Sequence, residues 1–131
     1  MDEVDGSRGV LLTAQGLLPY FERDAVHELI ARVAKRFSGG TLVFDVMPRW
    51  LSERSTTGFP TAGGYRAPPW PWGFDEREER ALRALHPSIA DLHRLRLPRG
   101  HGPVYGFALP LTAALPRARD RAPAVLRMSF I

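Results

Sequence analysis

The stretch "GVLLTAQGLLPYF", residues 9–21, contains a short strand, a polar break and a second apolar cluster. Val10 to Ala14 suit a buried strand, and the strand stops at Gln15 and Gly16. Two interpretations of Gln15 follow. It either satisfies loose backbone groups in a strand-to-helix turn, or it lies at a strand tip that touches a ligand.

An amphipathic helix and a second buried strand come next. Between residues 22 and 37, apolar side chains recur at helical spacing, at Val26, Leu29, Ile30, Val33, Ala34 and Phe37. The run "TLVFDVM", residues 41–47, is rich in β-branched and aromatic residues, as strands are. A helix between two mostly apolar strands predicts a right-handed crossover in a parallel sheet, and therefore an α/β fold.

The segment from Pro48 to Asp75 has no hydrophobic period and is rich in proline, glycine and tryptophan. A loop this long in a small domain is typically a lid or binding loop, and tryptophans need a surface to pack on. We therefore expect a lid-like loop over residues 48–74. Its aromatic residues either cover a substrate or close the edge of the core, and they are Tyr65, Trp70 and Trp72.

Further elements are expected after this loop. Asp75 is the predicted N-cap of a helix, with Glu78 as its capping-box partner. The sequence "ADLHRLRLP", residues 90–98, alternates as a strand does, and residues 124–131 form a last strand. Residues 103–116 fit either a strand or a helix interrupted by Pro110.

Composition limits the possible functions. The 131 residues contain no cysteine, which excludes disulfides and thiolate metal sites and makes a cytoplasmic location the expectation. The net charge is +4, but many of the basic residues are interleaved with acids, so we expect neither nucleic-acid binding nor membrane insertion.

The four histidines do not have the spacing of metal ligands, so no metal site is expected. They are His27, His86, His93 and His101. His101, in the glycine loop "GHG", is either a general base or a solvated loop residue. Asp45, near a strand end, either orients a substrate or serves as a cap or turn acid.

The order of "VLLTAQGLLPYF", an amphipathic helix, "GGTLVFDVMP", the "PWGF" loop and "VLRMSFI" resembles the second half of a class I S-adenosylmethionine-dependent methyltransferase. The most similar branch is the leucine carboxyl methyltransferase family with its polyketide-type O-methyltransferase relatives. The resemblance implies a Rossmann-like half-sheet made of the fourth to seventh strands, with the last strand antiparallel. It covers nearly the whole chain, and its most specific part is "QGLLPYF".

The resemblance also implies a site and a chemistry. Gln15 and Gly16 would contact S-adenosylmethionine, although Gln15 stands where that family commonly has an acid. Tyr20, Tyr65 and Trp72 would contact a small-molecule acceptor, which is methylated on an oxygen. No catalytic residue is identified, because methyl transfer needs alignment and exclusion of water more than acid–base help.

The first half of that fold is not found in this sequence. The nearest match to its glycine-rich turn is "GHGPVYG", residues 100–106, whose third glycine comes one position late. We therefore expect residues 1–131 to be the C-terminal part of a methyltransferase domain, inactive unless the missing half is supplied. Its open sheet edge would favour self-association or a complementing chain. The alternative is a non-catalytic interaction protein, or a remnant, that pairs through this edge.

Overall fold

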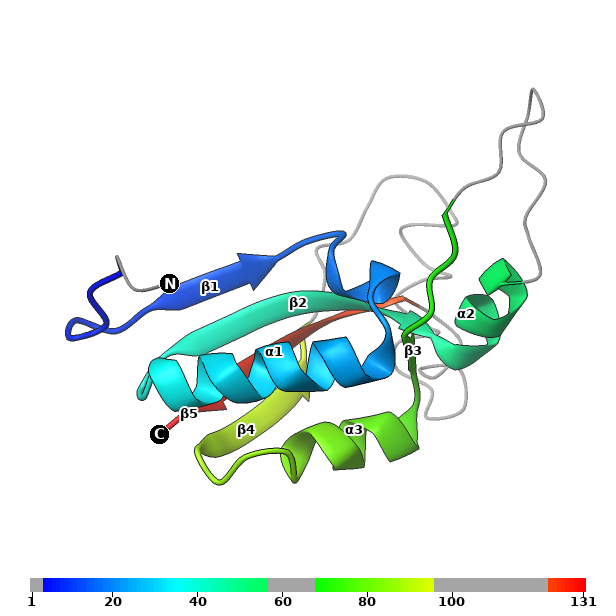
Figure 1. Ribbon diagram of the computed structural model, residues 1–131. Helices are drawn as coiled ribbons and strands as arrows, with labels where there is room; N and C mark the ends of the chain where they lie inside the picture. The colour runs from blue at the N-terminus through cyan, green and yellow to red at the C-terminus, as the bar shows by residue number, and fades with distance from the viewer. Residues whose placement is uncertain (1–3, 57–67, 96–122) are drawn as a thin grey trace, which may run out of the picture.

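The computed structural model describes residues 4–56, 68–95 and 123–131, which form an α/β structure on one sheet (Figure 1). The strands are β1 (Leu11–Ala14), β2 (Thr41–Pro48), β3 (Gly73–Phe74), β4 (Ile89–Arg94) and β5 (Ala124–Phe130). Their order across the sheet is β1-β2-β5-β4, and the short β3 pairs with the end of β2. The α/β class predicted from the sequence is confirmed for the described residues.

The first strand, helix and second strand form a parallel unit, as predicted, but β1 is exposed or half-buried along its length rather than buried, because it lies at the edge of the sheet. Helix α1 (Arg23–Arg36) buries one face, whose residues are Val26, Ile30, Val33 and Ala34. β1 and β2 then pair in parallel, from Leu11 opposite Thr41 to Ala14 opposite Phe44. Parallel pairing places the carboxyl ends of β1 and β2 at the same end of the sheet.

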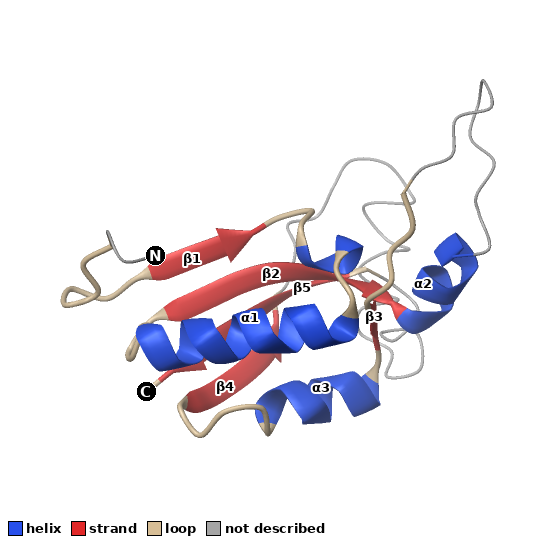
Figure 2. Cartoon of the chain, viewed as in Figure 1, coloured by secondary structure: helices blue, strands red, loops and turns tan. Residues whose placement is uncertain are grey.

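Helices α1 and α3 (Glu76–Arg83) lie on the same side of the sheet (Figure 2). The side chains of Leu126, Met128 and Phe130 alternate along β5 and are buried in the core shared with these helices. β5 is antiparallel to both β2 and β4, the direction expected for the last strand. Leu92 of β4 is buried and His93 is exposed, which agrees with the predicted alternation.

The segment expected to be a lid-like loop, residues 48–74, begins with regular structure instead. Helix α2 (Arg49–Thr56) follows β2 directly, and β3 lies at the end of the segment. The face of α2 turned inward carries serines rather than apolar residues, so the sequence shows no hydrophobic period there. Ser52 Oγ donates to the Trp70 carbonyl at 2.5 Å, and Ser55 Oγ accepts from the Trp70 N–H at 2.9 Å.

Asp75 is the N-cap of α3, as predicted, because its carboxylate accepts from the Glu78 N–H at 2.9 Å. The expected reciprocal role of Glu78 is wrong. The Glu78 side chain is buried and bonds to residues of α1 and to Trp72. The predictions for residues 103–116, for the "GHGPVYG" stretch, for His101 and for Tyr65 lie outside the described residues.

Candidate functional site

The turn after β1 lies at the carboxyl end of the parallel strand pair. Gly16 has a φ of 62°, a conformation that glycine adopts without steric cost. A Cβ added to Gly16 would meet nothing within 4 Å, so the backbone there is open to a ligand. Gln15 is exposed beside it. The structure therefore places Gln15 and Gly16, the two residues predicted to contact the cofactor, in one accessible turn.

Asp45 of β2 holds this turn in place. The Gly16 N–H donates to both Asp45 carboxylate oxygens, at 2.9 Å to Oδ1 and 3.1 Å to Oδ2. Of the two roles that the sequence leaves open for Asp45, the structure supports that of a turn acid. The Gly16 N–H is consequently occupied, so Gly16 offers close approach to a ligand rather than a free donor.

Tyr20 belongs to the short 3-10 helix η1 (Leu18–Tyr20) that follows the turn. Tyr20 is 47% exposed, and its ring packs edge to face on Trp70, with 6.4 Å between ring centroids. The backbone N–H of Trp72 donates to the Pro19 carbonyl at 3.4 Å. The segment carrying the two tryptophans is thus brought against η1, close in sequence to the Gln15–Gly16 turn.

Trp72 is a core residue in the described structure. It is 1% exposed, and its ring centroid lies 6.1 Å from that of Phe44 and 6.3 Å from that of Phe74. Its indole N–H donates to Glu78 Oε1 at 3.3 Å. Of the two interpretations of these aromatic residues, closure of the core edge describes the surroundings of Trp72. Its contact with a substrate stays a prediction.

Glu78 is the buried centre of a polar cluster that the sequence does not predict. Its carboxylate accepts from Arg23 Nε at 2.9 Å and from the Trp72 indole, and it contacts His27 Nε2. Burial raises the pKa of the Glu78 carboxyl, but hydrogen bonds from Arg23, His27 and Trp72 lower it, and the pKa ends below its ordinary value. Glu78 lies 55 residues from Arg23 and 51 residues from His27, so no local sequence pattern indicates this cluster.

The described histidines have protein partners. His27 contacts Glu78, His86 Nδ1 lies 2.8 Å from Ser88 Oγ, and His93 Nδ1 lies 2.9 Å from Asp91 Oδ2. Within residues 4–56, 68–95 and 123–131, no group of three or more potential ligand side chains could hold a metal ion.

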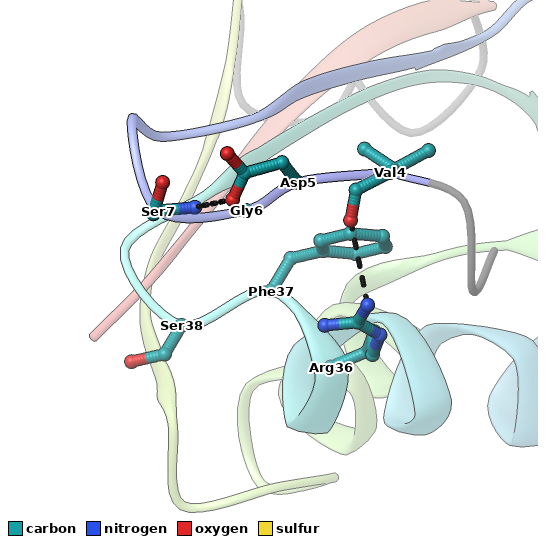
Figure 3. A pocket seen from close by; sticks show the side chains of 7 residues that line it. All are labelled: Val4, Asp5, Gly6, Ser7, Arg36, Phe37 and Ser38. Atoms are coloured by element: carbon teal, nitrogen blue, oxygen red, sulfur yellow. Dashed lines mark hydrogen bonds between the residues drawn. The ribbon is translucent and has the colours of Figure 1, made fainter.

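A hollow of about 540 Å³ lies away from the Gln15–Gly16 turn, at the amino ends of β1 and β2 (Figure 3). It is lined by Val4, Asp5, Gly6, Ser7, Arg36, Phe37 and Ser38. The Arg36 guanidinium stacks over the Phe37 ring at 5.4 Å and donates to the Val4 carbonyl at 3.4 Å. Arg36 therefore fastens the N-terminal segment to the end of α1.

A smaller groove of about 180 Å³ runs between β1 and α1, and its lining is almost entirely apolar. The residues that line it are Leu12, Thr13, Ala14, Leu18, Leu29, Ile30, Val33 and Leu42. This groove lies beside the outer strand of the sheet and contains no group suited to catalysis.

Comparison of the chain with family models, with curated proteins and with solved structures found no significant match. In the part of the chain that the structure describes, no helix has the length and apolar character needed to cross a membrane.

Proposed function

We propose that this chain takes part in methyl transfer from S-adenosylmethionine to an oxygen of a small molecule. The observation that carries the proposal is the open Gln15–Gly16 turn at the carboxyl end of β1, next to β2. Ligands of open α/β sheets bind beyond the carboxyl ends of the strands. Support also comes from the antiparallel β5 and from the outer position of β1, both of which the resemblance implies.

The turn fits the amino-acid part of the cofactor. The Gln15 amide is exposed, and it can donate to a carboxylate and accept from an ammonium group. The space above Gly16 allows the ligand to approach the backbone, while Asp45 fixes the turn and adds a negative charge near the ammonium group. When bound, the cofactor supplies a methyl group on a sulfonium, which is already a reactive donor.

The acceptor is expected on the side of η1. The exposed ring of Tyr20, backed by Trp70, offers an apolar wall against which an acceptor can be held. Such a wall contributes alignment and excludes water, the two needs of methyl transfer. Tyr65 stays a predicted member of this wall.

Isothermal titration calorimetry with S-adenosylmethionine tests the proposal on the chain as it stands. We expect weak, saturable binding, because the turn supplies contacts to one end of the cofactor. Loss of the Gln15 amide in Gln15→Ala should weaken binding about tenfold, equivalent to about 1.4 kcal/mol.

Lys35→Ala is the matched control, since Lys35 is exposed near the opposite end of the sheet. Its affinity should equal that of the unsubstituted chain. No heat of binding, or equal affinity in Gln15→Ala, would reject the proposal and favour the alternative of an interaction protein.

A further inference from the structure

The two edges of the sheet differ in their protection against pairing. β4 carries Asp91, His93 and Arg94, and its register shifts between Ile89 and Asp91. Charges and bulges of this kind discourage a second strand from adding to an edge. β1, by contrast, is "LLTA", without charge, proline or register shift. We propose that β1 pairs with β1 of a second copy of this chain, antiparallel and centred on Leu12.

The backbone of β1 determines which groups are free for this pairing. The Val10 carbonyl accepts from the Thr41 N–H at 2.8 Å, so Val10 turns its backbone toward β2. By the alternation of a strand, Leu12 and Ala14 do the same, whereas Leu11 and Thr13 direct their N–H and C=O groups outward. These four outward groups form the edge that a second strand can use.

An antiparallel register with Leu12 opposite Leu12 uses all of these groups. It places Leu11 of each copy opposite Thr13 of the other, and two residues in that position exchange both backbone hydrogen bonds. The symmetric interface therefore contains four backbone hydrogen bonds between the two copies. A register centred on Thr13 would instead require Gln15, which lies beyond the end of β1.

The side chains complement one another in the same register. On the α1 side, Leu12 and Ala14 line the apolar groove, and Val10 of the second copy would lie opposite the small Ala14. The two Leu12 side chains meet at the symmetry axis. On the other face, Leu11, which is 67% exposed, would be covered in part by Thr13 of the second copy. β1 lies at the margin of the sheet, where a second strand can reach it (Figure 1).

Charge favours a second copy over an unrelated apolar strand. Within the described residues, neither Arg8 nor Asp45 forms an ion pair. In an antiparallel pair, the segment before β1 of one copy, which carries Arg8, lies at the same end as the turn after β1 of the other copy, where Asp45 accepts from the Gly16 N–H. Pairing two copies therefore brings the Arg8 segment of one chain to the end of the interface where the other chain carries Asp45, and the symmetry does so twice.

This pairing does not depend on the proposed methyl transfer. It occupies the edge at which the resemblance places another strand, so a second copy and a complementing chain would compete there. Gln15 remains outside the paired segment. The pairing is tested by the mass of the particle in solution, and the proposed methyl transfer is tested by titration with the cofactor. Failure of one proposal can therefore be distinguished from failure of the other.

Sedimentation equilibrium of the purified chain tests the inference. The expected species at micromolar concentration is a dimer of twice 14.6 kDa, about 29 kDa. Thr13→Pro removes one outward N–H from each copy, and therefore two of the four hydrogen bonds, but no bond to β2. We expect its dissociation constant to rise at least about tenfold. The matched control, Thr13→Val, keeps the N–H and should dimerise as the unsubstituted chain does.

Leu11→Lys provides a second variant, because a lysine on an exposed edge opposes pairing without disturbing the core. Circular dichroism verifies that each variant is folded, and if Thr13→Pro is not, Leu11→Lys decides. The inference is overturned by an unsubstituted chain that stays monomeric, or by folded Thr13→Pro and Leu11→Lys variants that both associate as tightly as it does. A monomeric Thr13→Val would likewise overturn the backbone pairing.

Discussion

Asp45 illustrates how a single side chain connects distant parts of the chain. It lies 29 residues after Gly16 in the sequence, yet both of its carboxylate oxygens accept from the Gly16 N–H. β1 and β2 pair in parallel, and this brings the two residues to the same end of the sheet. The conformation of the candidate site thus depends on a residue of the neighbouring strand.

Replacing Asp45 tests this dependence. Asp45→Ala leaves the Gly16 N–H without its acceptor and should lower the free energy of unfolding by about 1 kcal/mol. Asp45→Asn keeps a side-chain oxygen that can accept, so its loss should be smaller. Urea denaturation of both variants measures the difference. Equal stability of Asp45→Ala and the unsubstituted chain would show that the bond does not hold the turn.

Glu78 links two helices and a loop. Through Arg23 and His27 it joins α3 to α1, and through the Trp72 indole it joins both to the segment before β3. The carboxyl pKa lies below its ordinary value of 4.5, so the folded chain holds a proton on Glu78 less readily than the unfolded chain does. The ionised Glu78 carboxylate therefore contributes its full share to the free energy of unfolding at pH values above 4.5. That contribution is lost as the pH falls through the lower pKa of the folded chain.

Glu78→Gln should therefore be less stable than the unsubstituted chain near neutral pH, by about 2 kcal/mol, since hydrogen bonds from charged groups are lost. The deficit should shrink as the pH falls below about 4.5, where the unsubstituted chain loses the same contribution. Thermal unfolding followed between pH 3 and pH 7 checks this expectation. A deficit that does not change with pH would contradict the assigned ion contacts.

Elements with a strong apolar pattern were predictable, and those built from polar side chains were not. The spacing of Val26, Ile30 and Val33 predicts α1, and the last strand predicted at residues 124–131 is β5. Helix α2 was not predicted, because its buried face consists of Ser52 and Ser55, which form hydrogen bonds with the backbone of Trp70. Glu78 occupies the capping-box position of α3, but its side chain is drawn inward by partners far away in the sequence. Such long-range contacts leave no local pattern.

At the scale of the whole molecule, the candidate turn and the hollow lie at opposite ends of the parallel strands in the described part of the chain. The Gln15–Gly16 turn follows the end of β1, whereas the hollow of about 540 Å³ lies before the starts of β1 and β2 (Figure 3). Of these two places, the turn has the position at which open α/β sheets bind ligands. A third surface, the edge of β1, connects the two.

The most direct measurement is a titration of the isotope-labelled chain with S-adenosylmethionine, followed through its backbone amide resonances. The proposed function predicts that the amides of Gln15, Gly16 and Asp45 shift with ligand concentration, while those of Gly6, Ser7 and Ser38 around the large hollow do not. Shifts confined to the hollow, or no shifts at all, would contradict it.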